Sequence, residues 1–307
     1  MIKTEHLGKR YETLTAVDDV SFEVAPGEVL GFLGPNGAGK TTTMRMLAGF
    51  ISPTSGKASI CGHDIETDTL AAKRLLGYLP EGAPLYGEMT VQRFLEFIAD
   101  LRNLTGSVRR NRLDYSIGRL QLGSVLEQTI ETLSKGFRRR VGLAQALMQD
   151  PPVLILDEPT DGLDPNQKHE VRTLINEMSR DKIIIISTHL LEEVEAVCTR
   201  AIIIARGRIV ADDTPQGLAA KSRYYNAVSL QLENPLELAA ARAAIEALPL
   251  VAAVEVSERD ARLTALPREG AQILPGLSEL AARQGLKLKE LHLESGRLDE
   301  VFRTITA

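Results

Sequence analysis

A glycine-rich segment at residues 34–42, which reads Gly-Pro-Asn-Gly-Ala-Gly-Lys-Thr-Thr, restricts the possible folds of this chain more than any other stretch. An apolar run at residues 29–33 precedes it, and a helix-like stretch at residues 41–50 follows it. The glycines are therefore expected at a turn from a strand into a helix. Because glycine lacks a Cβ and tolerates positive φ, such a turn can point several backbone N–H groups at an anion. The sequence predicts an α/β protein with a phosphate-binding loop.

The other residue types of this segment suit a nucleoside triphosphate. Lys40 supplies a cation for the β- and γ-phosphates, and the hydroxyl of Thr41 can ligate Mg²⁺. The positive end of the following helix adds to the attraction. A glycine-rich turn without a ligand is the alternative, and the register of Lys40 and Thr41 disfavours it. The residues predicted to contact the nucleotide here are Gly34, Pro35, Asn36, Gly37, Ala38, Gly39, Lys40, Thr41 and Thr42.

The charge balance and the apolar stretches exclude several classes of protein. With 36 basic and 41 acidic residues the net charge is −5, which argues against a polyanion-binding protein, so no nucleic acid is expected as a partner. Charged residues interrupt the apolar tract at residues 236–256, so no membrane span is expected there. The first six residues lack the apolar core of a signal peptide. Cys61 and Cys198 form no metal or redox pattern, and each is expected to be a small buried residue in a reducing compartment.

A second predicted strand, at residues 153–156, ends in two carboxylates, Asp157 and Glu158. An all-apolar strand is typical of a parallel sheet that is covered on both faces, and its carboxyl end faces the ligand crevice. Asp157 can hold Mg²⁺, and Glu158 can orient and deprotonate an attacking water molecule. The alternative is that these carboxylates cap the next helix.

His189 and Tyr11 are two further candidates. His189 follows a third buried strand, at residues 183–187, and is expected at the same edge as the γ-phosphate, although a lone histidine is more often structural. Tyr11 is either a half-buried aromatic or a residue that stacks on adenine.

A helix is predicted to begin after Ser134, a good N-cap residue, and its start offers another anion site. Residues 138–140 are three consecutive arginines near this helix start, where they oppose the helix dipole. A solvated charged face is one interpretation of this run, and an anionic neighbour is the other.

With Lys40, Ser134, Asp157, Glu158 and His189 in this order, roughly the first 215 residues resemble the nucleotide-binding subunit of ABC transporters. The resemblance implies an ATPase with ATP and Mg²⁺ as cofactors, a P-loop NTPase core and a helical, transporter-facing subdomain. It further implies that Tyr11 stacks on adenine, that Glu158 and His189 are catalytic, and that two copies close head to tail on two ATP molecules. In such a homodimer, Ser134 and Gly136 contact the γ-phosphate bound to the opposite subunit.

Two positions depart from the pattern of this family. Glu81 replaces the glutamine usual at the Q-loop, where the family residue contacts Mg²⁺, and a carboxylate can also ligate that ion. The signature motif reads Leu-Ser-Lys-Gly-Phe at residues 133–137 rather than Leu-Ser-Gly-Gly-Gln. Both departures are similar to those in the ATPase subunits of the ABC-2 class, which power export or the maturation of membrane complexes.

The expected domains are a nucleotide-binding domain at residues 1–218, with its helical subdomain at about 84–145, and an accessory α+β domain at residues 225–307. The second domain shows a βαββαβ order, which suggests a small ferredoxin-like sandwich with a dimerisation or regulatory role.

The leading hypothesis is an ATP-hydrolysing subunit that powers integral membrane permease subunits, located in the cytoplasm at the inner face of the cell membrane. One alternative is an ATP-gated clamp on nucleic acid or ribosomes, which the single ATPase unit, the lack of sustained heptads and the acidic charge disfavour. A phosphotransferase is the other alternative, which the signature motif disfavours.

Overall fold

The computed structural model describes residues 1–82 and 85–306 and divides into two compact units, Met1–Asp212 and Asp213–Ile305. Two of the predicted segment limits, residues 84 and 307, lie outside the described residues. In the parts that the structure covers, no helix is both long and apolar enough to span a membrane.

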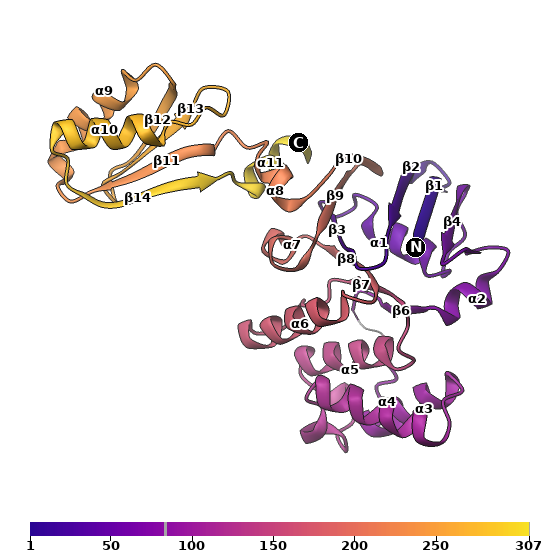
Figure 1. Ribbon diagram of the computed structural model, residues 1–307. Coiled ribbons are helices and arrows are strands. Elements are labelled where there is room, and N and C mark those ends of the chain that lie inside the picture. Colours follow the sequence, from indigo (N-terminus) through magenta and orange to yellow (C-terminus); the bar gives the residue numbers. More distant parts are fainter. Residues whose placement is uncertain (83–84, 307) are drawn as a thin grey trace. The chain divides into compact units, whose positions relative to one another are not determined.

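A six-stranded sheet forms the centre of the first unit (Figure 1). Its strand order is β10-β9-β3-β8-β7-β6, and the pairs β9-β3, β3-β8, β8-β7 and β7-β6 are parallel. The strands are β3 (Val29–Leu33), β6 (Leu76–Leu79), β7 (Val153–Asp157), β8 (Ile183–Thr188), β9 (Arg200–Ala205) and β10 (Arg208–Asp213). Every residue of β3, β7 and β8 is buried, as the apolar runs predict.

Alternate residues of these strands enter two separate cores. Leu154 and Leu156 of β7 join the core shared with the helical segment, whereas Val153 and Ile155 join the core on the opposite face. That second core also contains a smaller antiparallel sheet of order β2-β1-β4-β5. Its strands are β1 (Ile2–Tyr11), β2 (Leu14–Val24), β4 (Ser55–Ile60) and β5 (His63–Asp64). The central sheet is therefore covered on both faces, which leaves its carboxyl edge for a ligand.

The helices of the first unit include a predicted helical segment between β6 and β7. Its helix α3 buries Val91, Phe94, Leu95 and Ile98, whose spacing of three and four residues predicts this face. The helices are α1 (Lys40–Leu47), α2 (Thr69–Arg74), α3 (Val91–Leu101), α4 (Gly106–Arg119), α5 (Lys135–Leu147), α6 (Pro165–Met178) and α7 (Leu191–Val197), with short 3₁₀ turns η1 (Gly123–Val125) and η2 (Ile130–Thr132).

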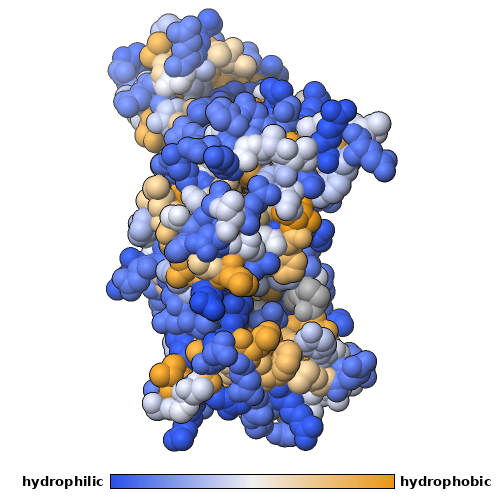
Figure 2. All heavy atoms as spheres, turned by 90° about the vertical axis from the view of Figure 1, so that its right-hand side faces the viewer, coloured by the Kyte–Doolittle hydropathy of each residue, from blue (hydrophilic) through white to orange (hydrophobic). Residues whose placement is uncertain are grey.

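An apolar surface accompanies this helical segment. Figure 2 shows apolar side chains across the lower part of the face that it displays, the level at which Figure 1 places α3 and α4. Tyr86 and Phe97 are both exposed there, with their ring centroids 5.7 Å apart. A contiguous exposed apolar surface of this kind can receive a partner.

The second unit has the predicted βαββαβ order. Its four strands pair antiparallel in the order β12-β13-β11-β14, and α9 and α10 pack on one face of the sheet over Val228 and Leu230. The elements are α8 (Pro215–Ala219), β11 (Tyr225–Leu232), η3 (Pro235–Glu237), α9 (Leu238–Glu246), β12 (Val251–Ser257), β13 (Arg262–Pro267), α10 (Leu274–Gln284), β14 (Leu288–Ser295) and α11 (Leu298–Thr306). The predicted fold class, a P-loop α/β core with a small C-terminal α+β sandwich, is confirmed.

The two cysteines differ from each other. Cys198 packs against the core, and burial raises the pKa of its thiol to about 12. Cys61 is exposed in the turn between β4 and β5, so the expectation that it is buried is wrong. It lies in a tight turn, where its backbone adopts φ 50°, and such connections run over the protein surface.

Candidate nucleotide site

The glycine-rich segment forms a turn from β3 into α1, as predicted. Gly37 and Gly39 adopt φ of 79° and 108°, values that favour glycine. Gly34 does not need positive φ; instead, a Cβ on it would lie 2.4 Å from the carbonyl oxygen of Ile204. A Cβ on Gly39 would lie 2.6 Å from the carbonyl oxygen of Ala16. Because neighbouring carbonyl oxygens leave no room for a Cβ, positions 34 and 39 require glycine.

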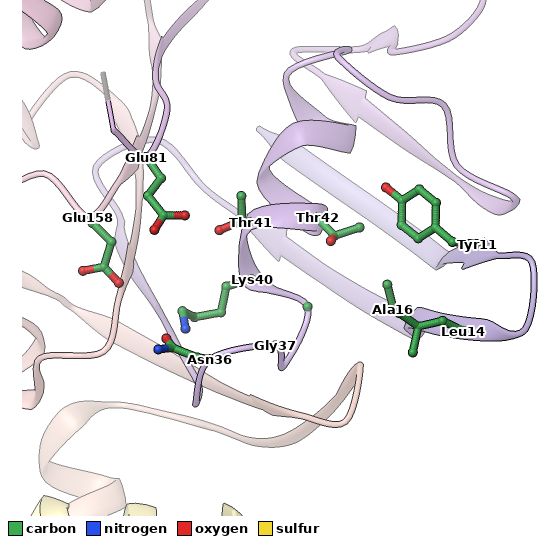
Figure 3. Close-up of a pocket in the computed structure, with 11 residues that line it drawn as sticks. Tyr11, Leu14, Ala16, Asn36, Gly37, Lys40, Thr41, Thr42, Glu81 and Glu158 are labelled. Atoms are coloured by element: carbon green, nitrogen blue, oxygen red, sulfur yellow. The ribbon is translucent and has the colours of Figure 1, made fainter. Parts of the chain in front are cut away.

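A cavity of about 420 Å³ opens above this turn. Figure 3 shows Tyr11, Leu14 and Ala16 at one end, Glu81 and Glu158 at the other, and Lys40 between them. The lining residues are Tyr11, Leu14, Ala16, Asn36, Gly37, Gly39, Lys40, Thr41, Thr42, Glu81 and Glu158. The cavity thus has an apolar end that suits a nucleobase and a charged end that suits phosphates and a metal ion.

Lys40 lies buried at the centre of the site. Its Nζ donates hydrogen bonds to the carbonyl oxygens of Gly34, at 2.6 Å, and Pro35, at 3.2 Å. Burial lowers the pKa of Lys40, while the carboxylates of Glu158, Asp157 and Glu81 raise it. The loop itself holds this cation, and the three carboxylates offset part of the cost of burying its charge.

Side-chain oxygens that could ligate Mg²⁺ lie at the start of α1 and after the ends of β6 and β7. Asp157 is 1% exposed, and among the described residues neither of its carboxylate oxygens has a hydrogen-bond partner. Burial raises the pKa of Asp157, and the nearby hydroxyls of Ser187 and Thr41 oppose this effect. Such a buried, unpartnered carboxylate suits a cation, and Thr41 and Glu81 add hard oxygen donors. The residues present therefore fit Mg²⁺, which characteristically completes its shell with phosphate and water.

Glu158 has an unusual backbone and a well-defined neighbour. It adopts φ 52°, a left-handed conformation that costs a non-glycine residue about 1–3 kcal/mol and is typical of functional sites. Nδ1 of His189 lies 2.8 Å from its Oε1, and the Thr188 hydroxyl donates to its Oε2 over 3.5 Å. The structure therefore brings Glu158 and His189 together at the edge of the sheet, as predicted. It does not use the carboxylate as a helix cap: Asp164 caps α6 instead.

Ser134 and Gly136 are not among the residues that line this cavity. Ser134 is exposed and caps α5, with its hydroxyl accepting a hydrogen bond from the N–H of Phe137, as predicted. Gly136 is buried against the side chain of Gln167, whose Oε1 would lie 2.7 Å from a Cβ there. The predicted contact of these residues with a nucleotide on another subunit stays a prediction.

Sequence reasoning missed two residues that line the cavity. Leu14 and Ala16 line the apolar end of the cavity beside Tyr11, because Leu14 pairs with Tyr11 across the β1–β2 hairpin. The two-residue turn between those strands was the available signal. Among the three arginines, Arg138 is exposed but Arg139 and Arg140 are 5% and 6% exposed, so a solvated face is wrong for both of them. Arg139 bonds to backbone carbonyls beside the site rather than to an anion.

The fold and the site together define a P-loop nucleoside triphosphatase. A sequence model described as "ABC transporter" matches residues 17–161. The Nod factor export ATP-binding protein I of Burkholderia pseudomallei strain 1710b is 37% identical over 238 residues, which cover 77% of this chain and 78% of that protein. An uncharacterised ABC transporter ATP-binding protein of Bacillus subtilis, YhcH, is 31% identical over 100% of this chain and 96% of its own length. The chain belongs to the ABC transporter family, as one of its ATP-binding proteins.

Other relatives agree on this family. A probable multidrug ABC transporter ATP-binding protein of Escherichia coli K12, YbhF, is 36% identical over 72% of this chain, but the match spans only 38% of that protein's length. Among solved structures, an ATP-binding subunit of an ABC transporter superposes with a TM-score of 0.67 and 30% identity, covering 72% of this chain and 92% of the other. The chain is accordingly an ATP-binding protein of the ABC transporter family.

Proposed function

We propose that this chain hydrolyses ATP in order to drive a separate pair of integral membrane permease subunits, as part of an exporter. One observation carries the proposal: Glu158, with His189 bonded to it, lines the same cavity as Lys40 and Thr41. A general base, a phosphate-binding cation and a metal-binding hydroxyl thus line one cavity, which is what phosphoryl transfer to water requires.

The proposed roles follow from position and charge. Lys40 holds the β- and γ-phosphates, and main-chain N–H groups within residues 36–42 surround them. Tyr11 stacks on the adenine at the other end of the cavity. Glu158 orients the attacking water and accepts its proton, and His189 holds the Glu158 carboxylate in place and contacts the γ-phosphate.

Thr41, Asp157 and Glu81 are the residues that would hold Mg²⁺. The ion supplies charge neutralisation on the phosphate oxygens when it is bound. Of the three, Glu81 carries a charge where the family has a neutral glutamine. The Glu81 carboxylate would be compatible with phosphate as one of the residues that hold Mg²⁺, since the ion would offset the negative charge of both.

A homodimer completes each site in this proposal. Ser134 and Gly136, outside the cavity of their own chain, would contact the γ-phosphate on the second copy. A solved ABC transporter cassette with the same fold, MJ0796, which is 23% identical, is described as dimeric. The N-cap position of Ser134 leaves free N–H groups at the start of α5 for that contact.

The direction and the location belong to the same proposal. The names of two relatives refer to Nod factor export and to multidrug transport, which favours export. The ABC-2 class is proposed from the departures at Glu81 and in the signature motif. The exposed aromatic pair Tyr86 and Phe97 offers a docking surface for a membrane subunit. The chain would then work in the cytoplasm, at the inner face of the cell membrane.

Capture of the permease tests this proposal. Tagged Glu158→Gln protein is expressed in its native cells and recovered in mild detergent with MgATP, and co-purifying proteins are identified by mass spectrometry. The expected result is a multispan membrane protein in stoichiometric amount, which is reduced when Phe97 is replaced by Ser. Recovery only of nucleic acid or ribosomal proteins would overturn the transporter role and favour an ATP-gated clamp.

A further inference from the structure

Arg139 is a buried cation that the proposed reaction leaves without a role. It projects from α5 and is not among the residues that line the cavity. Its Nη1 donates a hydrogen bond to the carbonyl oxygen of Pro80 at 3.0 Å, and its Nη2 donates to the carbonyl oxygens of Asp157 and Glu158. One guanidinium therefore joins the end of β6 to the end of β7, the two segments that carry carboxylates into the site.

The guanidinium is suited to this position by both shape and charge. Its planar fork presents donors in two directions, whereas a lysine would present a single flexible ammonium group. Burial lowers the pKa of Arg139, and the carboxylates of Asp161, Asp157, Glu158 and Glu81 oppose that effect. The residue thus offsets part of the negative charge that the site concentrates.

The main chain of Glu158 is held on both sides. Its N–H donates to the carbonyl oxygen of Ser187 at 2.8 Å, and its own carbonyl oxygen accepts from Arg139. These two bonds bracket the residue whose φ is 52°. A left-handed conformation persists only where surrounding contacts enforce it, and it decides in which direction the carboxylate projects.

We propose that Arg139 is a positioning residue, which is anchored on the carbonyl of Pro80 and fixes the backbone of Glu158 so that its carboxylate faces the cavity. The inference rests on the proposed role of Glu158 as the base. Arg139 acts through Glu158 and touches no part of the cavity, so its loss lowers turnover without lowering nucleotide affinity.

The same helix supplies two matched controls. Arg138 is exposed, so Arg138→Met tests the loss of a nearby positive charge. Arg140 is as buried as Arg139, but it donates to the carbonyl oxygen of Leu120 at 3.2 Å and lies over the ring of Phe137. Arg140→Met therefore tests the loss of a buried arginine from α5 without any change beside the site.

The experiment measures kcat, the dissociation constant for a non-hydrolysable MgATP analogue, and the melting temperature of each full-length variant. Arg139→Met is expected to lower kcat by about 10- to 100-fold, since small misplacements of a catalytic group have effects of this size, with the dissociation constant within about twofold of the parent. Arg139→Lys should recover part of kcat. Arg138→Met and Arg140→Met should keep the parent kcat at temperatures where they are folded.

A double variant separates positioning from a general structural effect. Because Arg139 acts through Glu158, Arg139→Met should lower the residual turnover of Glu158→Gln no further, whereas independent effects would multiply. An unchanged kcat in folded Arg139→Met, or a fall in affinity equal to the fall in kcat, would overturn the inference. If Arg139→Met does not fold, Arg139→Gln, which keeps an amide donor, is measured in its place. Normal turnover of the single variant Glu158→Gln would instead overturn the proposed role of Glu158 as the general base.

Discussion

Replacement of Glu158 by Gln is expected to remove most ATP turnover and to leave MgATP binding intact. The amide keeps the size of the side chain and can still hydrogen-bond to His189, but it cannot accept a proton from water. General base catalysis contributes a factor of about 10² to 10⁴, and the loss should fall in this range. Phosphate release under single-turnover conditions and the dissociation constant for MgATP together measure the effect.

A matched control for Glu158 is available on the same domain. Glu195 is exposed on α7, so Glu195→Gln removes one carboxylate at the surface without any change in the cavity. Its turnover should equal that of the parent. Turnover within a few-fold of the parent in Glu158→Gln itself would contradict the assignment of the base.

Replacement of Lys40 by Met is expected to weaken MgATP binding by about 10- to 100-fold, because a hydrogen bond to a charged group contributes roughly 1.5–3 kcal/mol. Two opposing changes act on the folded state without nucleotide. Methionine removes a buried charge whose desolvation lowers its pKa, but it also leaves the carbonyl oxygens of Gly34 and Pro35 without the hydrogen bonds from Nζ, so the melting temperature without nucleotide should stay close to that of the parent.

Thermal unfolding with and without nucleotide reads out both effects of Lys40→Met. The parent should melt at a higher temperature in MgATP, by an amount that depends on ligand concentration, and the variant should lose most of this increase. Lys73→Met, at an exposed position on α2, is the control and should keep the increase. An unchanged increase in Lys40→Met would contradict the placement of the phosphates beside this lysine.

The parts of the fold that could be predicted are those that neighbouring residues encode. The glycine-rich turn, the buried strands β7 and β8 and the βαββαβ order of the second unit are all visible as local patterns. The order of strands in each sheet could not be predicted, because strand pairing joins residues far apart in the chain. The pairing of β3 with β9, for example, joins Leu30 to Arg200.

More of the charged end of the site than of its surroundings could be predicted from the sequence. Lys40, Asp157 and Glu158 follow fixed spacings from strands, so their positions at the sheet edge follow from sequence. Arg138 and Arg139 are the same residue type in the same helix, and the 100° rotation between successive positions exposes one and buries the other. Which of the two arginines faces the site depends on how α5 packs against the rest of the domain. The three consecutive arginines give no information about that packing.

Mixing two inactive variants tests the central claim, a pair of ATP sites shared between two copies, most directly. Ser134→Arg retains Glu158 but blocks the start of α5, whereas Glu158→Gln retains Ser134 but lacks the base. A mixed dimer holds one site with both residues intact. If the sites are shared, an equal mixture should recover about a quarter of the parent phosphate release, since half of the dimers are mixed and each has one of two sites working. A mixture no more active than the separate variants, each folded and binding MgATP, would contradict the claim.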